Sequence, residues 1–241
     1  TRRGYTFMAL NRYKDAETDF NAAVSLRPKK KKTWFLLASA RRFQNNRDGV
    51  VHAMENIVAI NPASPGLRME VAQFYYHSDY LENASDTLES YLTLVPDDHR
   101  ALFFIGYIAM TRNKPDTALD WYIRSYKAAP ENLDALNQAS DMLLKLDRYD
   151  DALDLMRRVT KNQTGYGVIE LRARVYEAAG WCSDAAFWYR RAAEVSPWKM
   201  GRANLKSKAD DLTQNCRPPH DQPADIALYS DETPHPGNEE Q

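Results

Sequence analysis

Residues able to carry catalysis are scattered along the chain without the spacing that a site requires. The five histidines have no metal-ligand spacing; they are His52, His77, His99, His220 and His235. The run from Gly165 to Glu170 begins like a dinucleotide-binding fingerprint but ends in glutamate where a glycine is needed, and no strand pattern precedes it. Phosphate-loop, zinc-protease and nucleophile-elbow motifs are missing. We therefore expect no enzyme activity, no cofactor and no metal site.

Four consecutive lysines at 29–32 form the strongest charge run and allow two interpretations. Together with Arg27 they could grip an acidic partner or a phosphate, or they could be a solvated loop whose charge suits a helix C-terminus. Nucleic-acid binding would need a basic stripe that continues, but the neighbouring loops carry Asp97, Asp98 and Glu131. The net charge of −1 gives no electrostatic case for wrapping nucleic acid. We therefore expect no nucleic-acid partner.

Composition limits the elements that could position these residues. The 241 residues include only 9 glycines, about half the usual share of ~7%, which disfavours sandwiches and nucleotide-binding sheets. Mean hydropathy is −0.64, and no run approaches the ~18 apolar residues of a membrane helix. We expect a soluble chain without membrane insertion, and because it begins at Thr1 we expect a processed chain or a fragment. The compartment stays open between cytoplasmic and periplasmic or otherwise extracytoplasmic.

Prolines mark an internal repeat. Those that close units are Pro28, Pro62, Pro96 and Pro130, spaced by 34 residues, and Pro197, whereas the fifth unit has Thr164 and an expected irregular joint. A small residue lies twelve positions before each of these six unit-closing positions: Ala16, Val50, Ala84, Ala118, Ala152 and Ala185. A bulky residue stands eight before: Phe20, Met54, Leu88, Tyr122, Met156 and Tyr189. Each period thus predicts two amphipathic helices.

Turn and cap residues separate the predicted helices. Within units, the residues that tolerate the left-handed conformation are Asn11, Asn45, Asp79, Asn113, Asp147 and Gly180. Three positions later we expect N-caps at Asp48, Asp116, Asp150 and Ser183. Between units the expected caps are Ser64, Asp97 or Asp98, and Asn132, and Pro65 is expected at a first helical position.

This pattern resembles the tetratricopeptide repeat family from residue 1 to about 197, with Trp34, Leu37 and Ala38 at the family's aromatic, leucine and small positions. The resemblance implies an all-α, right-handed superhelical solenoid of antiparallel helix pairs. The predicted units are 1–30 (truncated at its start), 31–64, 65–98, 99–132, 133–165 and 166–199. A capping helix at 200–216 and a disordered, acidic, proline-rich tail at 217–241 follow. The tail's one apolar island, at 226–229, is interpreted either as a short linear motif or as plain tail.

The resemblance also implies a concave groove, lined by the first helix of each unit, that holds a protein or peptide ligand. The family's groove positions carry over as Tyr5, Met8, Phe35, Ser39, Arg42, Phe43, Met69, Gln73, Tyr76, His77, Arg100, Phe103, Tyr107, Met110, Asn137, Asp141, Lys145, Glu170, Arg174 and Glu177. The first four units offer aromatics and methionines and the last two offer charge, which predicts a ligand with an apolar anchor and a polar stretch. The alternative is that the aromatics only pack between repeats.

Family resemblance points to a non-catalytic interaction scaffold or adaptor, without naming its partner. The clamp for carboxylate tails of heat-shock chaperones is largely missing, because its positions hold Phe35, Ser39, Glu70, Arg100 and Phe104. The alternative is that the chain forms the repeat portion of a larger enzyme or of a component of a secretion or envelope assembly. In that case it would belong to a larger complex.

Cys182 and Cys216 occupy equivalent positions of adjacent units, counting the terminal helix as half a unit. Such positions lie roughly 8–10 Å apart, beyond the usual ~4.4–6.8 Å between the α-carbons of a disulfide, although turn residues could close the gap. The two alternatives are a disulfide, which would favour an extracytoplasmic location, and two free thiols.

Overall fold

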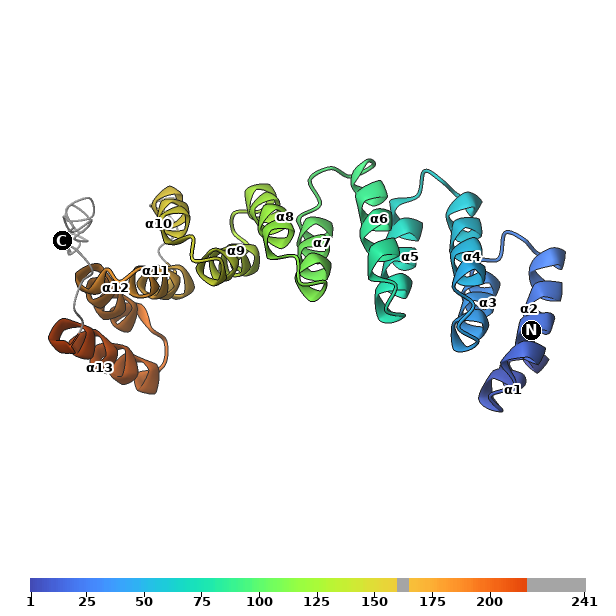
Figure 1. Ribbon diagram of the computed structural model, residues 1–241, viewed down its shortest axis with the longest axis horizontal. Coiled ribbons are helices and arrows are strands. Elements are labelled where there is room, and N and C mark those ends of the chain that lie inside the picture. Colours follow the sequence, from blue (N-terminus) through green and yellow to red (C-terminus); the bar gives the residue numbers. More distant parts are fainter. Residues whose placement is uncertain (160–164, 216–241) are drawn as a thin grey trace, which may run out of the picture. The chain divides into compact units, whose positions relative to one another are not determined.

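The computed structural model describes residues 1–159 and 165–215 (Figure 1). Over these residues it contains thirteen α-helices and no strand, which confirms the prediction of an all-α repeat solenoid. The helices are α1 (Arg2–Ala9), α2 (Tyr13–Leu26), α3 (Lys31–Phe43), α4 (Arg47–Ile60), α5 (Pro65–His77), α6 (Leu81–Leu92), α7 (His99–Thr111), α8 (Pro115–Ala128), α9 (Leu133–Lys145), α10 (Tyr149–Arg158), α11 (Tyr166–Ala178), α12 (Cys182–Val195) and α13 (Lys199–Asn215). The joint at Thr164, Cys216 and the tail at 217–241 lie outside the described residues.

The turn inside each helix pair depends on a residue in the left-handed conformation, as predicted. The non-glycine residues with positive φ are Asn11, Asn45, Asp79, Asn113 and Asp147, with φ between 55° and 64°, and Gly180 has φ 80°. Asparagine and aspartate tolerate this conformation better than other residues with a Cβ. Since the turn needs no glycine, the scarcity of glycine in the composition is explained.

The predicted caps within units are wrong, because the second helices begin earlier than expected. The N-caps of α4, α10 and α12 are Asn46, Arg148 and Trp181, in place of Asp48, Asp150 and Ser183. The side chain of Asn46 accepts a hydrogen bond from Gly49 N at 2.9 Å. The three predicted aspartates, including Asp116 in α8, lie in the first helical turn, where a carboxylate stabilises the positive end of the helix dipole. Between units the caps Ser64, Asp98 and Asn132 are confirmed.

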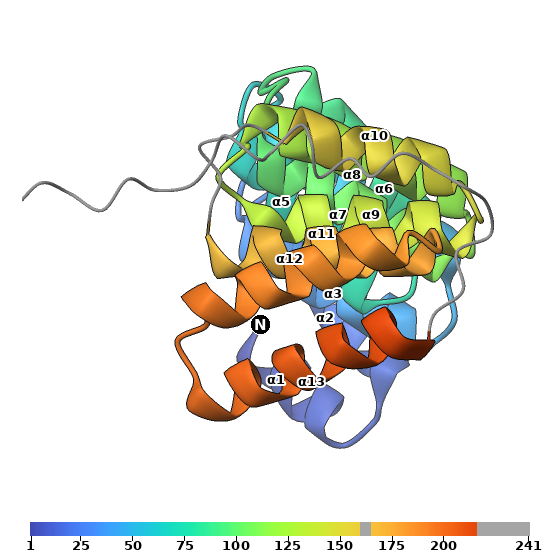
Figure 2. The same cartoon turned by 90° about the vertical axis from the view of Figure 1, so that its left-hand side faces the viewer.

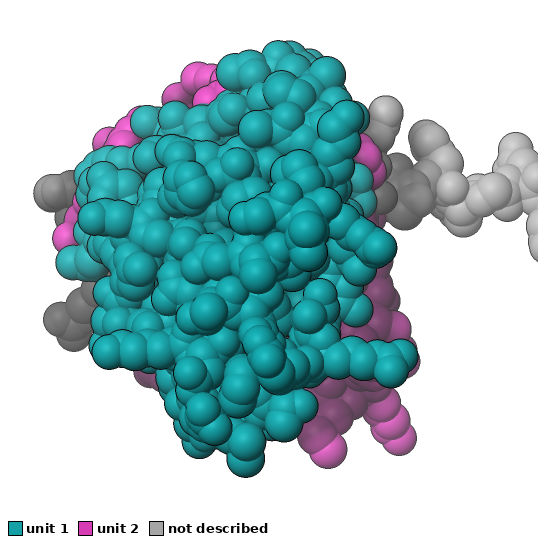
Figure 3. Space-filling model, turned by 90° about the vertical axis from the view of Figure 1, so that its right-hand side faces the viewer, with its two compact units in different colours: residues 1–121 teal, residues 122–241 magenta. Residues whose placement is uncertain are grey.

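Residues 1–121, which we call unit 1, form one compact body that holds α1 to α7 and the start of α8 (Figure 3). Each of the helices α1 to α6 contacts the next one along the chain. The repeated small and bulky positions make the core, since Ala16, Phe20, Val50 and Met54 are all fully buried. A Cβ on Gly4 would lie 2.7 Å from the ring of Phe20, so the missing side chain lets α1 approach α2.

The second compact body, unit 2, begins at residue 122, inside α8. Its last described helix, α13, packs along α12 (Figure 2) and buries Leu205 and Ala209. A polar contact joins three of its helices at the same place. Tyr189 of α12 donates to Glu177 Oε2 of α11 at 2.6 Å, and Lys208 Nζ of α13 lies 2.8 Å from the same oxygen. The side of α12 that faces away from α11 is thereby covered by α13 of the same chain.

Candidate partner-binding surface

One pocket of unit 1 brings together six of the residues that the sequence singled out. Its volume is about 690 Å³. The six are Met69, Gln73 and Tyr76 of α5 and Arg100, Phe103 and Tyr107 of α7. On each helix these positions recur at three and four residues, so a single stripe of each helix lines the space. Gly66, Tyr91, Asp98 and Phe104 complete the lining.

Aromatic contacts hold the pocket wall in place. The rings of Tyr76 and Phe104 meet edge to face with centroids 5.0 Å apart, and the centroids of Tyr76 and Tyr107 are 6.0 Å apart. Hydrogen bonding to Tyr107, together with burial, raises the pKa of Tyr76 above its usual value of 10.0. Tyr107 is nevertheless 40% exposed. The wall is therefore built before any ligand arrives and still presents aromatic surface to solvent.

Asp98 forms the polar end of the pocket and also caps α7. Its carboxylate accepts hydrogen bonds from the backbone N–H groups of Arg100 and Ala101 at 2.9 and 3.3 Å, and from the Tyr91 hydroxyl at 2.6 Å. Burial alone would raise the pKa of Asp98, but these bonds outweigh it and hold the pKa below the usual 3.8. The hydrogen bond to Asp98 in turn raises the pKa of Tyr91.

Other predicted residues of unit 1 lie outside this pocket lining. On α3, Phe35 packs against Phe74 with ring centroids 5.7 Å apart. Phe43 stacks on Tyr13 of α2 at 4.8 Å, and the guanidinium of Arg42 lies 4.5 Å from the centre of the Phe43 ring. Tyr5, Met8, Ser39, His77 and Met110 also lie outside the lining. Partner contact at these residues stays a prediction.

The predicted residues of unit 2 form a different kind of surface. Asn137, Asp141 and Lys145 lie on α9, and Arg174 lies on α11. Arg174 pairs with Asp141 at 2.7 Å between Nη2 and Oδ1, so two of the four residues already neutralise each other. Glu177 of α11, another predicted groove residue, accepts a hydrogen bond from Tyr189 and pairs with Lys208. A charged ligand would have to compete with these internal contacts.

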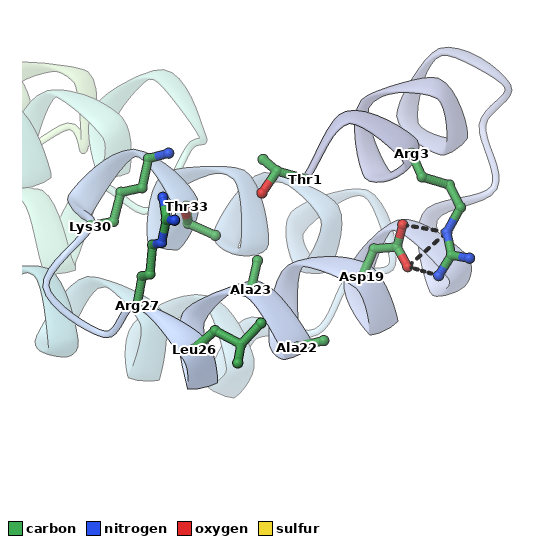
Figure 4. A pocket seen from close by; sticks show the side chains of 9 residues that line it. All are labelled: Thr1, Arg3, Asp19, Ala22, Ala23, Leu26, Arg27, Lys30 and Thr33. Carbon is green, nitrogen blue, oxygen red and sulfur yellow. Dashed lines mark hydrogen bonds and ion pairs between the residues drawn. The ribbon is translucent and has the colours of Figure 1, made fainter.

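A second pocket in unit 1, of about 510 Å³, lies where α1, α2 and the start of α3 meet (Figure 4). Arg3 of α1 reaches Asp19 of α2, with Nε 2.8 Å from Oδ2, as the dashed lines in Figure 4 show. Arg27 and Lys30 of the basic run also line this pocket. It contains none of the residues that the sequence assigned to the groove.

Sequence reasoning missed the pocket residues contributed from outside the first-helix stripes. Tyr91 lies in the last turn of α6, and Asp98 was expected only as a cap. Phe104 was singled out only because it occupies one of the positions of the carboxylate clamp for chaperone tails. An aromatic seven residues before a capping aspartate is the signal that could have found the Tyr91–Asp98 pair, since both end up at the same junction between helix pairs.

Three further expectations concern metal sites, membrane helices and the two cysteines. Among the described residues, no group of three or more metal-ligating side chains comes together, and none of the described helices has the length and apolarity to cross a membrane. Cys182 is buried at the first position of α12. Because Cys216 lies outside the described residues, the disulfide between them stays a prediction.

Comparison with known proteins places this architecture in a family. Two family models, both described as tetratricopeptide repeat, match residues 1–30 and 74–132. Together with the repeated helix pairs, these matches show that the chain belongs to the tetratricopeptide repeat family, whose fold is that of a protein-interaction scaffold. No curated protein matches the chain by sequence.

Solved structures with the same fold are distant in sequence. YrrB, described as a TPR protein with an unusual peptide-binding site, is 15% identical, with 78% of this chain and 97% of YrrB covered and a TM-score of 0.50. The C-terminal part of a TPR repeat-containing protein from Cytophaga hutchinsonii is 18% identical, with 75% of this chain and 73% of that one covered and a TM-score of 0.52. At these identities the likeness shows the fold alone.

Proposed function

We propose that the chain is a non-catalytic scaffold that binds a peptide or a helix of a partner protein on unit 1. The binding surface would be the exposed side chains of α1, α3, α5 and α7, which we call the first-helix surface. An apolar side chain of the partner would be anchored in the pocket between α5 and α7. The observation that carries the proposal is this pocket of about 690 Å³, walled by the aromatic rings of Tyr76, Phe103, Phe104 and Tyr107.

The pocket has the chemistry of a binding site for an apolar anchor. Pockets of roughly 300–1,000 Å³ that combine apolar walls with a few polar groups are typical of ligand sites. Aromatic side chains supply a large contact area and lose little conformational freedom on binding. Since Tyr76 is already packed against Phe104 and Tyr107, the cost of ordering the wall is met on folding rather than on binding. Peptide binding by a protein of the same fold, YrrB, agrees with this class of function.

Selection from a random peptide library tests the proposal and does not require the natural partner. The full chain is immobilised, and peptides fused at both ends are selected and then measured individually by fluorescence anisotropy. Tyr107→Ala should weaken binding of the selected peptides by about 1–3 kcal/mol, the range of a central interface aromatic. The matched control is Tyr149→Ala, because Tyr149 is a tyrosine of similar exposure (36%) in unit 2.

Unchanged affinity for Tyr107→Ala and for Phe103→Ala, with helicity preserved in both variants, would refute the assignment of the pocket. Equal losses for Tyr107→Ala and Tyr149→Ala would also refute it, since the effect would then not be specific to unit 1. Circular dichroism of every variant separates loss of binding from loss of fold.

A further inference from the structure

Charge is divided unevenly between the two kinds of helix in unit 1. The first helices, α1, α3, α5 and α7, carry eight arginines and lysines but a single carboxylate, that of Glu70. The second helices, α2, α4 and α6, carry two basic residues against eight acidic ones. All seven helices lie in the part of the chain that the structure describes. The net charge of −1 therefore conceals a positive set of helices and a negative set within one unit.

Side-chain hydrogen bonds inside unit 1 occupy half of the eight cations. These are Arg3 with Asp19, Lys31 with Glu70, Arg41 with Glu17 and Arg68 with Ser90. The Lys31 contact also occupies the one carboxylate of the four first helices, with Nζ 2.6 Å from Oε1 of Glu70. The other four cations are Arg2, Lys32, Arg42 and Arg100.

Lys32 and Arg100 hold the same position in their helices. Each is exposed in the first turn, three residues before an aromatic of the predicted groove: Phe35 follows Lys32 and Phe103 follows Arg100. A spacing of three residues places cation and aromatic on one helix face. The first-helix surface thus repeats a pairing of a cation with an aromatic on α3 and again on α7.

Arg100 remains available although Asp98 is close. The nearest approach between them is 3.7 Å, from Nε to Oδ1, and the Arg100 side chain is 80% exposed. Both carboxylate oxygens of Asp98 already accept hydrogen bonds, one from the N–H groups that it caps and the other from Tyr91. The guanidinium can therefore take up a further carboxylate at the rim of the pocket, where an ion pair with a ligand adds specificity.

We infer that the partner segment that docks on unit 1 is acidic, with an apolar anchor for the α5/α7 pocket and carboxylates on both sides that pair with Arg100 and with Lys32. This inference rests on the proposed function. Lys32 lies on α3 and Arg100 on α7, the first helices that precede and follow α5 along unit 1. The anchor lies between the two acidic positions. The acidic second helices repel the same segment and favour its approach to the first-helix surface.

The peptides selected as above on the full chain provide the test. Their mean net charge should be clearly negative, with aspartate or glutamate on both sides of an aromatic or aliphatic residue. Because both ends are fused, no terminal carboxylate contributes. Arg100→Glu and Lys32→Glu should each weaken binding about tenfold or more, and Arg100→Gln by less. Affinity should also fall steeply with added salt.

Lys14→Glu is the matched control, since Lys14 is an exposed cation of the same unit on the second helix α2, and this variant should bind as tightly as the unaltered chain. Selected peptides that are neutral or basic, yet depend on Tyr107, would overturn the inference and leave the proposed function intact. Peptides whose binding ignores Tyr107 would overturn both. The chain's own residues 219–232, which surround the apolar island at 226–229 with acidic residues, belong in the panel. Their binding would support the acidic chemistry and identify the tail as an occupant.

Discussion

The two compact units are built from the same helix pairs but present different first-helix positions to solvent. In unit 1 the rings of Tyr76 and Tyr107 line an open pocket, and over the four first helices arginines and lysines outnumber carboxylates by eight to one. In unit 2 the corresponding helices carry charges that neutralise each other, as Arg174 and Asp141 do. There the space next to α12 is also covered by α13.

This difference shows where function is encoded in a repeat. The core positions are alike in both units, since Ala16 and Phe20 are as fully buried in unit 1 as Ala185 and Tyr189 are in unit 2. Positions that the core does not use are free to vary, and on the described first helices of unit 1 they combine an apolar pocket with a surplus of positive charge. These differences support the proposal that the partner binds on unit 1, whereas α13 packs on α12 at the described end of unit 2.

The largest effect on stability is expected at the terminal helix. Leu205→Ala removes a side chain that is 8% exposed and leaves a cavity between α12 and α13. Truncations of this kind cost about 2–5 kcal/mol, and the lower end applies to a helix packed on one side. Urea unfolding followed by circular dichroism measures the loss.

Two comparisons accompany Leu205→Ala. Met200→Ala is the control, because Met200 is 78% exposed on the same helix and should cost little. Peptide affinity at unit 1 should be unchanged in both variants, and a loss of affinity in Leu205→Ala at a temperature where the chain is folded would break the proposed division of roles.

The next effect is expected at Asp98, which joins the stability of unit 1 to its pocket. Asp98→Ala removes the cap of α7 and the acceptor of the Tyr91 hydroxyl, which should lower the free energy of unfolding by about 1–2 kcal/mol. Asp98→Asn keeps a capping oxygen and should cost less. Thermal unfolding of the three proteins decides, and equal melting temperatures would show that the cap contributes nothing.

A pH dependence follows from the same carboxylate. Because the folded state lowers the pKa of Asp98 below 3.8, its contribution to stability is complete above that value and is lost as the pH falls through the lowered pKa. Unfolding measured from neutral pH down to about pH 2 should therefore show a steeper acid loss for the unaltered chain than for Asp98→Asn. Parallel profiles for the two proteins would contradict this explanation of the shift.

The smallest effect is expected in unit 2. Arg174→Ala breaks an exposed ion pair with Asp141, which should cost at most about 1 kcal/mol of stability. Affinity for the selected peptides should not change. A clear loss of affinity would instead favour the sequence-based expectation of a groove that extends over Asn137, Asp141, Lys145 and Arg174.

Much of the fold could be predicted from the sequence because its determinants are local and repeated. The left-handed turn residues, from Asn11 to Gly180, follow from conformational preference alone and were correctly predicted. The N-cap predicted at Asp48 was wrong, because Asn46 caps the helix instead and α4 therefore begins at Arg47. Mutual neutralisation of Asp141 and Arg174 could not be foreseen either, because it depends on which side chains of neighbouring helices meet.

Hydrogen exchange of the full chain with and without a selected peptide tests the central claim most directly. We predict that saturating peptide slows exchange of the backbone amides in α5 and α7, residues 65–77 and 99–111, and leaves α9 and α11 of unit 2 unchanged. Slowing confined to α9 and α11, or no slowing in α5 and α7, would contradict the assignment of the binding surface to unit 1.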